Sequence, residues 1–297
     1  MNRSASALAG IGLTVGAMAC FATLDSTTKY VSTSVPLFMA LWFRYAFQAV
    51  ATTAVILPLR GLAVLRTAHP KFQMLRGLLL LSASVFAFFS LRYMPVGEFT
   101  AIVMIVPLVI TLLAATALGE RVSMLRWCLV LGGFVGTLVI IRPWHDTFEW
   151  TTLLPLVVVM CNAGFQVLTS KLAKTEDPVT MHLYTGWVGT LLASIALPFV
   201  WAPLATWSLW GWLVLMGCAA TIGHFMLIVA YKNTHASTLT PYLYAQVGFA
   251  MLGGWIAFSY VPDHWALLGM AMIAVCGALG AWLAVREGKV LIQPAES

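Results

Sequence analysis

A few ionisable side chains interrupt long apolar runs, and they are the first candidates for chemistry. Asp25 and Lys29 lie four residues apart in one run, Arg44 lies in the next run, and His224 lies in a later one. Ionisable groups are costly in an apolar medium, and where they occur they mark pathways for ions, protons or solutes. Two interpretations of Asp25 stay open: an ion pair with Lys29 one turn on, or a pair with Arg44 that forms a charged gate or a proton-coupling site. His224 either relays protons or forms a hydrogen bond with a neighbouring helix.

Amide and hydroxyl side chains form a second set of candidates. Asn162 and Gln166 are four residues apart and share one face of a predicted helix, where amides either contact a solute or join helices. Tyr242 and Gln246 share one face of a later helix, and Tyr244 lies on the next face. The residues expected to contact a substrate are Met104, Asn162, Gln166, His224, Tyr242, Tyr244 and Gln246.

Pro107 lies inside another apolar run, at a place that matches Gln246. Proline removes a backbone hydrogen bond and frees a carbonyl group, which lines a cavity or builds a hinge in many membrane helices. We therefore expect the helices of Pro107 and Gln246 to border a central cavity, with Met104 facing it. Helix packing is the alternative. Gating or coupling is predicted for Asp25, Arg44 and Pro107.

Other kinds of chemistry find little support in the sequence. His145, Asp146 and Glu149 form the one cluster that a membrane enzyme could use, and three residues in a short connection are typical of a solvated turn. No glycine-rich nucleotide-binding loop that ends in Lys and Ser or Thr occurs. The five cysteines lack the paired spacing of a metal or redox site. We predict a protein without enzymatic activity and without a cofactor or metal.

Composition identifies the medium around these residues. Of 297 residues, 61% are apolar and 9% are charged, whereas soluble domains carry roughly 25% charged residues. Apolar runs long enough to cross a hydrocarbon layer of roughly 30 Å recur along the whole chain. In lipid such runs must be helices, because the backbone of an open strand would lack partners. We predict an all-α integral membrane protein with ten transmembrane helices, at residues 8–31, 36–59, 74–92, 97–117, 124–141, 150–171, 179–200, 208–231, 237–259 and 264–284.

The net charge of +6 comes from basic residues that cluster between the apolar runs. They form no stripe on one element, which argues against nucleic acid as a partner. Basic residues concentrate in cytoplasmic loops. With a cytoplasmic N-terminus, twelve of them fall in inside segments, Arg76 included, and Lys29, Arg92 and Arg142 face outside. We predict a multi-pass protein of the inner membrane with both termini in the cytoplasm.

Two parts of the chain echo each other. Residues 28–30 (Thr-Lys-Tyr) at the end of the first span resemble residues 170–172 (Ser-Lys-Leu) at the end of the sixth, and 90–93 resemble 229–232. The echo predicts two five-helix repeats, 1–146 and 147–297. Because five is odd, the second repeat enters the membrane from the opposite side, so the repeats are inverted. Inverted repeats suit alternating access around a site near the midplane, and we therefore expect a secondary transporter.

Several short motifs carry a resemblance to a known family. They are Trp42-Phe43-Arg44-Tyr45, Leu75-Arg76-Gly77, residues 91–97, Pro107, Leu118-Gly119-Glu120-Arg121, Gly132-Gly133 and Gly136-Thr137. With them the sequence resembles, over nearly its whole length, the drug/metabolite transporter superfamily and its ten-span family with two EamA units. The second unit departs from the family pattern, because Ser259-Tyr260 stands where a Gly-Glu pair is usual.

The resemblance also implies a function. Similar members export amino acids or other small metabolites, and related branches take up nucleotide-like cofactors. We therefore expect export of amino acids or similar metabolites across the inner membrane, with uptake of a nucleotide-like cofactor as the alternative. A membrane enzyme, a channel and a scaffold are remote alternatives. The expected partners are a small-molecule substrate and the lipid bilayer.

Overall fold

The computed structural model describes residues 3–93, 96–117, 119, 122–141, 153–258 and 263–290, and within them the chain forms helices and connecting turns, without a strand. The first half contains α1 Arg3–Val31, α2 Leu37–Arg60, the 3-10 helix η1 Gly61–Leu65, α3 Pro70–Tyr93, α4 Val96–Val103, α5 Val106–Thr116 and α6 Met124–Ile141. The second half contains α7 Leu153–Leu172, α8 Pro178–Val200, α9 Trp207–Asn233, α10 Ala236–Leu243, α11 Ala245–Phe258 and α12 His264–Val290.

Six of the described helices are long and apolar enough to cross a membrane. They span Ala7–Val31, Leu37–Leu65, Pro70–Tyr93, Leu153–Leu172, Pro178–Val200 and Trp207–Asn233. Large apolar side chains point outward from the bundle, such as Phe199 and Trp207, which are 87% and 89% exposed. A surface of this kind is stable in contact with lipid and unstable in water. The chain is a multi-pass membrane protein.

The helix ends follow local chemistry. Asp177 precedes α8 and its side chain accepts a hydrogen bond from the backbone N–H of Val179, while Pro178 takes the first helical position, where its missing N–H costs nothing. α2 ends at Arg60, and the next residue, Gly61, has a φ of 64° that suits glycine. α12 continues from the predicted end at residue 284 to Val290. Residues 285–290 include charged residues, so hydropathy does not count them as part of a membrane span. The same charged residue types form helices well, which is why the helix continues.

Two predicted spans, the fourth and the ninth, are each divided into two helices. α4 gives way to α5 at residues 104–105, just before Pro107, and α10 gives way to α11 at Tyr244, just before Gln246. Pro107 has no N–H, so the carbonyl of Val103 loses its helical partner. The sequence predicted one span over 97–117 with a hinge or a cavity-lining carbonyl at Pro107, and the structure divides this span just before that proline. The matching break at Tyr244 has its nearest proline, Pro241, inside α10.

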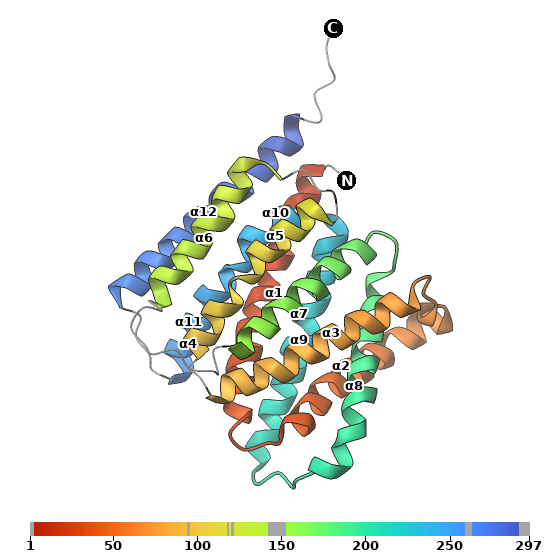
Figure 1. Ribbon diagram of the computed structural model, residues 1–297. Coiled ribbons are helices and arrows are strands. Elements are labelled where there is room, and N and C mark those ends of the chain that lie inside the picture. The colour runs from red at the N-terminus through yellow and green to blue at the C-terminus, as the bar shows by residue number, and fades with distance from the viewer. Residues whose placement is uncertain are drawn as a thin grey trace.

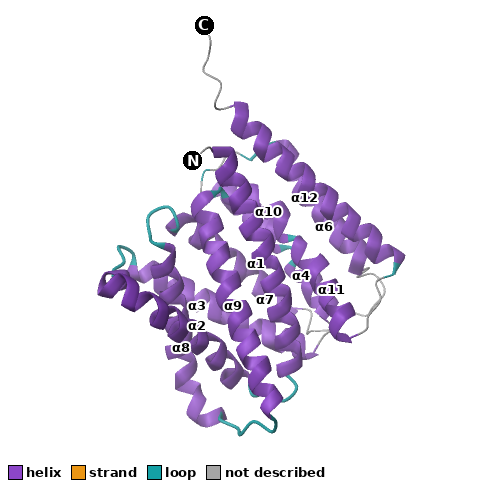
Figure 2. Ribbon diagram, turned by 180° about the vertical axis from the view of Figure 1, so that it is seen from behind, coloured by secondary structure: helices purple, strands orange, loops and turns teal. Residues whose placement is uncertain are grey.

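Helices that are far apart in the sequence pack side by side in the bundle. α1 packs against α9, α3 against α7, α2 against α8, and α6 against α12 (Figure 1). Glycine allows α2 and α8 to approach closely, because a Cβ atom at Gly186 would lie 2.9 Å from the backbone nitrogen of Ala49. The beginning of α1 and the end of α12 lie at the same end of the bundle (Figures 1 and 2).

Candidate functional site

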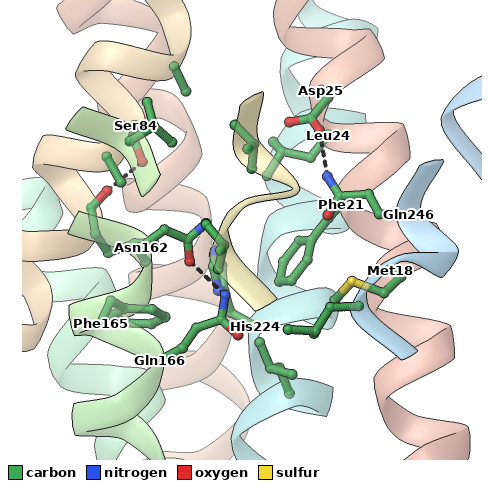
Figure 3. A pocket seen from close by; sticks show the side chains of 18 of the residues that line it. Met18, Phe21, Leu24, Asp25, Ser84, Asn162, Phe165, Gln166, His224 and Gln246 are labelled. Atoms are coloured by element: carbon green, nitrogen blue, oxygen red, sulfur yellow. Dashed lines mark hydrogen bonds between the residues drawn. The ribbon is translucent and has the colours of Figure 1, made fainter. Parts of the chain in front are cut away.

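A cavity lies between α1, α2, α3, α7 and α9, at the level where the divided helices α4–α5 and α10–α11 are interrupted (Figure 3). The cavity has a volume of about 100 Å³, and the empty space with its wide opening included is about 780 Å³. Its walls are mostly apolar, and its polar side chains are Asp25, Arg44, Ser84, Asn162, Gln166, His224 and Gln246.

The cavity brings together eight of the ten residues that the sequence marked as candidates. These residues are Asp25, Arg44, Met104, Pro107, Asn162, Gln166, His224 and Gln246. They come from seven different helices or helix breaks, so the fold collects residues that are more than 200 positions apart in the chain. Met104 lies in the interruption before Pro107, and both residues line the cavity.

Tyr242 and Tyr244 are not among the residues that line this cavity. Tyr244 is fully buried against α6, where a Cβ atom at Gly133 would lie 2.5 Å from its ring. The Tyr242 hydroxyl lies 3.1 Å from the position of a Cβ atom at Gly280 in α12. The prediction assumed one continuous helix, and the break at Tyr244 changes the direction in which these side chains point.

The first polar wall of the cavity, called here the donor wall, consists of Arg44, Ser84 and His224. Arg44 donates from Nη1 to Ser84 Oγ at 2.6 Å and from Nη2 to His224 Nε2 at 3.0 Å. A guanidinium group only donates, so Nε2 of His224 accepts and the ring proton is on Nδ1. Arg44 Nε and His224 Nδ1 are buried and have no partner in the protein. The donor wall therefore contains a positive charge and two N–H groups that have no partner in the protein.

The second polar wall, the acceptor wall, consists of Asp25 and Gln246. Gln246 Nε2 donates to Asp25 Oδ2 at 2.7 Å, which links α1 to α11. Figure 3 shows this pair on the other side of the cavity from Asn162 and Gln166. Lys29 is turned away, since its Nζ donates to the carbonyl of Leu91 at 2.7 Å. Asp25 thus binds Gln246 rather than its helix neighbour Lys29, and its other carboxylate oxygen can accept from a solute.

The amides of α7 form a hydrogen-bonded chain along the cavity. Tyr231 donates to Gln166 Oε1 at 2.7 Å, and Gln166 Nε2 donates to Asn162 Oδ1 at 2.8 Å. These contacts fix which atom of each amide is the oxygen. Asn162 is only partly buried, so its NH₂ group is the part of the chain that a solute can reach. The sequence left two roles open for these amides, joining helices or contacting a solute. Gln166 joins helices, and Asn162 lies where a solute can reach it.

Two aromatic rings that the sequence did not mark hold His224 in place. The ring centroids of Phe21 and His224 are 4.7 Å apart, and the Phe165 ring meets His224 edge-on at 5.7 Å. Both phenylalanines also line the cavity. A phenylalanine in an apolar run carries no signal in the sequence, because the same residue packs against lipid or against other helices. Their role follows from the fold alone.

Several predictions concern residues that the structure does not describe. The cluster of His145, Asp146 and Glu149 lies outside the described residues, as do Glu120, Arg121 and the departure at Ser259-Tyr260. Among the residues that are described, no group of three or more His, Cys, Asp or Glu side chains could hold a metal ion. The five cysteines are free thiols.

Comparison with known proteins identifies the family of this chain. Residues 8–142 match the model of the EamA-like transporter family. Over 269 residues the chain is 30% identical to a riboflavin transporter of Vibrio cholerae, covering 86% of this chain and 87% of the relative. The chain belongs to the EamA-like transporter family of the drug/metabolite transporter superfamily.

Other relatives of this EamA-like transporter carry different solutes. It is 26% identical to an S-adenosylmethionine uptake transporter of Rickettsia bellii, over 89% of this chain and 90% of the relative. It is also 26% identical to the pseudopaline exporter CntI of Pseudomonas aeruginosa, over 91% and 95%. One solved crystal structure has the same fold, with a TM-score of 0.75 at 21% identity, over 93% of this chain and 98% of the other. The protein is a small-molecule transporter of the membrane.

Proposed function

We propose that the protein is a secondary carrier for a small metabolite that contains a nitrogen heterocycle, and that the central cavity is its binding site. The observation that carries the proposal is the arrangement of the cavity: a donor wall, a separate acceptor wall, and aromatic side chains that line the same cavity. A planar heterocycle has ring nitrogens and carbonyl groups that accept hydrogen bonds and N–H groups that donate them. Such a solute can satisfy both walls while its apolar surface contacts the apolar side chains that line the cavity.

The relatives support this solute class over the amino acids that the sequence favoured. Riboflavin and S-adenosylmethionine, named for the relatives of Vibrio cholerae and Rickettsia bellii, share a nitrogen heterocycle. The two relatives match along most of this chain. The uptake of a cofactor-like solute thus gains weight over the export of amino acids, while the pseudopaline exporter keeps the outward direction open.

A zwitterionic amino acid or related metabolite is the second candidate. It is favoured by the opposite charges in the cavity, Arg44 on the donor wall and Asp25 on the acceptor wall. A carboxylate would accept from Arg44 Nε and His224 Nδ1, and an ammonium group would donate to Asp25. Both ends of the solute would then have charge-assisted hydrogen bonds. The two candidates use the same walls and differ in what fills the apolar space between the walls.

Alternating access between two inverted repeats, 1–146 and 147–297, is the mechanism that we propose. In this correspondence α1–α6 match α7–α12, and the packing of α1 on α9 matches that of α3 on α7. Gly77 of α3 meets Val188 of α8, and Gly217 of α9 meets Phe47 of α2 in the same way. The equal lengths of α4 and α10, eight residues each, and the breaks that follow them support the correspondence further.

Exchange of the conformations of the two repeats would then open the cavity to each side of the membrane in turn. We place the protein in the inner membrane with both termini in the cytoplasm. The distribution of basic residues supports this orientation, as does the common position of the start of α1 and the end of α12 (Figure 2). The sequence contains no nucleotide-binding loop of the P-loop type, so the driving force is a gradient of an ion or of the solute itself.

Counterflow in proteoliposomes tests the function. Vesicles with purified protein are loaded with unlabelled riboflavin, S-adenosylmethionine or a mixture of neutral amino acids, and entry of the labelled counterpart is followed with and without a pH gradient. Saturable exchange of one of the two heterocyclic solutes is the expected result. Exchange of amino acids alone would establish the second candidate instead. Absence of exchange with every solute, from protein that is folded and monodisperse, would contradict the proposal.

A further inference from the structure

A second group of polar side chains lies outside the central cavity, where α2, α3, α7 and α8 meet. At its centre is Arg76, which is completely buried. Its Nε donates to Thr169 Oγ1 at 2.8 Å, and its Nη1 donates to Gln73 Oε1 at 2.9 Å and to the carbonyl of Met181 at 3.0 Å. The sequence counted Arg76 among the charges that set the orientation in the membrane. The structure places it inside the helix bundle.

His182 and Gln48 extend this group. Gln48 Nε2 donates to the carbonyl of His182 at 3.0 Å and lies 3.3 Å from Nδ1 of the same residue. Because the amide NH₂ is the donor, Nδ1 accepts and the ring proton of His182 is on Nε2. His182 is 2% exposed and follows Met181, whose carbonyl binds Arg76. We call Arg76, Gln73, His182 and Gln48 the Arg76 cluster.

The free atoms of the Arg76 cluster are mainly hydrogen-bond donors. Arg76 Nη2, Gln73 Nε2 and His182 Nε2 are buried and have no partner in the protein, and the one free acceptor is Gln48 Oε1. The orientation of Gln73 is fixed, because its Oε1 accepts from Arg76. Buried donors of native proteins nearly always have a partner. A free donor is thus carried by Arg76 itself, by its partner Gln73 and by His182, the neighbour of its partner Met181, and the chain supplies no acceptor for any of them.

The charge of Arg76 is also without a counter-ion among the described residues. Its three hydrogen-bond acceptors are neutral, and no described carboxylate forms a salt bridge with it. The acidic residues between α7 and α8 have other partners. Asp177 pairs with Arg60, and Glu176 accepts hydrogen bonds from Thr67 and the backbone of His69. Water would satisfy free donors but would leave this buried charge uncompensated.

A single aromatic ring separates the Arg76 cluster from the cavity. The guanidinium carbon of Arg76 lies 5.1 Å from the centroid of Phe165, and the same ring meets His224 of the donor wall. Phe165 is 1% exposed and lines the cavity. The cluster is thus adjacent to the transport site without being part of it.

We propose that the Arg76 cluster is a binding site for a small inorganic anion such as chloride. The anion accepts hydrogen bonds from Arg76 Nη2, Gln73 Nε2 and His182 Nε2, and it neutralises the guanidinium. It joins α3 of the first half to α8 of the second half, because Gln73 and Arg76 belong to α3 and His182 belongs to α8. Bound anion therefore stabilises the packing of the two halves on this side of the bundle.

Thermal unfolding of the full-length protein in detergent tests the site without any transport substrate. Sodium gluconate is replaced stepwise by sodium chloride at constant ionic strength. The expected result is a saturable rise of Tm, by about 2 °C or more, as for a ligand that binds the folded state alone. Arg76→Gln should abolish the rise. Arg66→Gln, which removes the same charge from an exposed side chain, should keep it.

Gln73→Leu keeps the charge of Arg76 and removes one donor of the site, together with the oxygen that accepts from Arg76 Nη1, so it serves if Arg76→Gln does not fold. It should shift the chloride concentration of the half-maximal effect upward by fivefold or more. Bromide, which can be located by its anomalous scattering, should occupy the same place in crystals. A chloride response that is absent in the wild type, or is unchanged in Arg76→Gln or in Gln73→Leu, would overturn the proposal. Because no solute is transported, failure here is distinct from failure of the carrier function.

Discussion

Arg44 and His224 are joined by a hydrogen bond of 3.0 Å between Nη2 and Nε2, across 180 positions of the chain. The other partner of Arg44 is Ser84 of α3. In the proposed repeats α3 matches α9, so Arg44 binds two matching helices at once. Any movement of α3 relative to α9 must change these contacts, so the donor wall is sensitive to the conformation of the carrier.

His224 is expected to act as a hydrogen-bond acceptor for Arg44 and to be neutral during transport. His224→Gln provides an amide oxygen in its place, and counterflow should fall by no more than about fivefold, the loss of one modest hydrogen bond. His224→Leu leaves a buried donor of Arg44 without a partner, a loss of about 1–3 kcal/mol that should reduce counterflow more than about tenfold. The pH profile of His224→Gln should match that of the wild type. A profile that loses a titration step would instead establish His224 as a proton relay.

Asp25→Asn tests the acceptor wall with little change of shape. The amide oxygen can still accept from Gln246, but the negative charge is lost. Transport should fall by about tenfold or more, because charged hydrogen bonds contribute about 1.5–3 kcal/mol. Asp25→Glu, which keeps the charge, should retain part of the activity. Full counterflow by Asp25→Asn would exclude a charged gate, a coupling site and an ionic contact with the solute at this position.

Alternating access predicts that the cavity is reached from both sides of the membrane. Asn162→Cys is made in a variant whose five native cysteines are replaced by alanine, and a membrane-impermeant maleimide is added to vesicles of either orientation. Modification from both sides, with protection by the transported solute, is expected. Leu191→Cys is the control, since Leu191 is 61% exposed on the lipid-facing surface and its thiol should not react. Modification of Asn162→Cys from one side under all conditions would argue against the mechanism.

The close approach of α2 and α8 makes a prediction about stability. Gly186→Ala would place a methyl group 2.9 Å from the backbone nitrogen of Ala49 and 3.0 Å from its Cα. Backbone cannot rotate away as a side chain can, so overpacking should destabilise the protein by about 1–3 kcal/mol. Gly211→Ala is the matched control, because a Cβ atom there meets nothing within 4 Å. Equal unfolding temperatures of the two variants would show that the interface can adjust.

Much of this fold could be predicted from hydropathy and punctuation, because lipid allows few structures other than helices. Six long helices lie where apolar runs predicted spans, and the break before α5 lies next to Pro107, where the sequence indicated a hinge or a cavity-lining carbonyl. Ionisable residues such as Asp25, Arg44 and His224 could be found because their cost in lipid makes them conspicuous. All three line the same cavity, so an ionisable residue in an apolar run was a useful indication of the candidate site.

The remaining features depend on contacts that a single sequence does not reveal. The break at Tyr244 has no proline at its own position, so the directions of Tyr242 and Tyr244 were predicted from a continuous helix. The rings that pack against His224 belong to phenylalanines, and phenylalanines are common throughout the apolar runs. Arg76 was counted as a loop charge, because its burial depends on Thr169 and Met181, about a hundred positions further along the chain.

The account rests most directly on the donor wall as the place where solute binds. The decisive measurement is counterflow of the transported solute by Arg44→Gln, compared with Arg66→Gln and wild type at equal amounts of folded protein. Arg44→Gln removes the charge and the free Nε donor, and we predict a loss of about tenfold or more, while Arg66→Gln stays within about twofold of the wild type, as exposed charges contribute little. Wild-type counterflow and affinity in Arg44→Gln would contradict the central claim, because the solute would then bind without the donor wall.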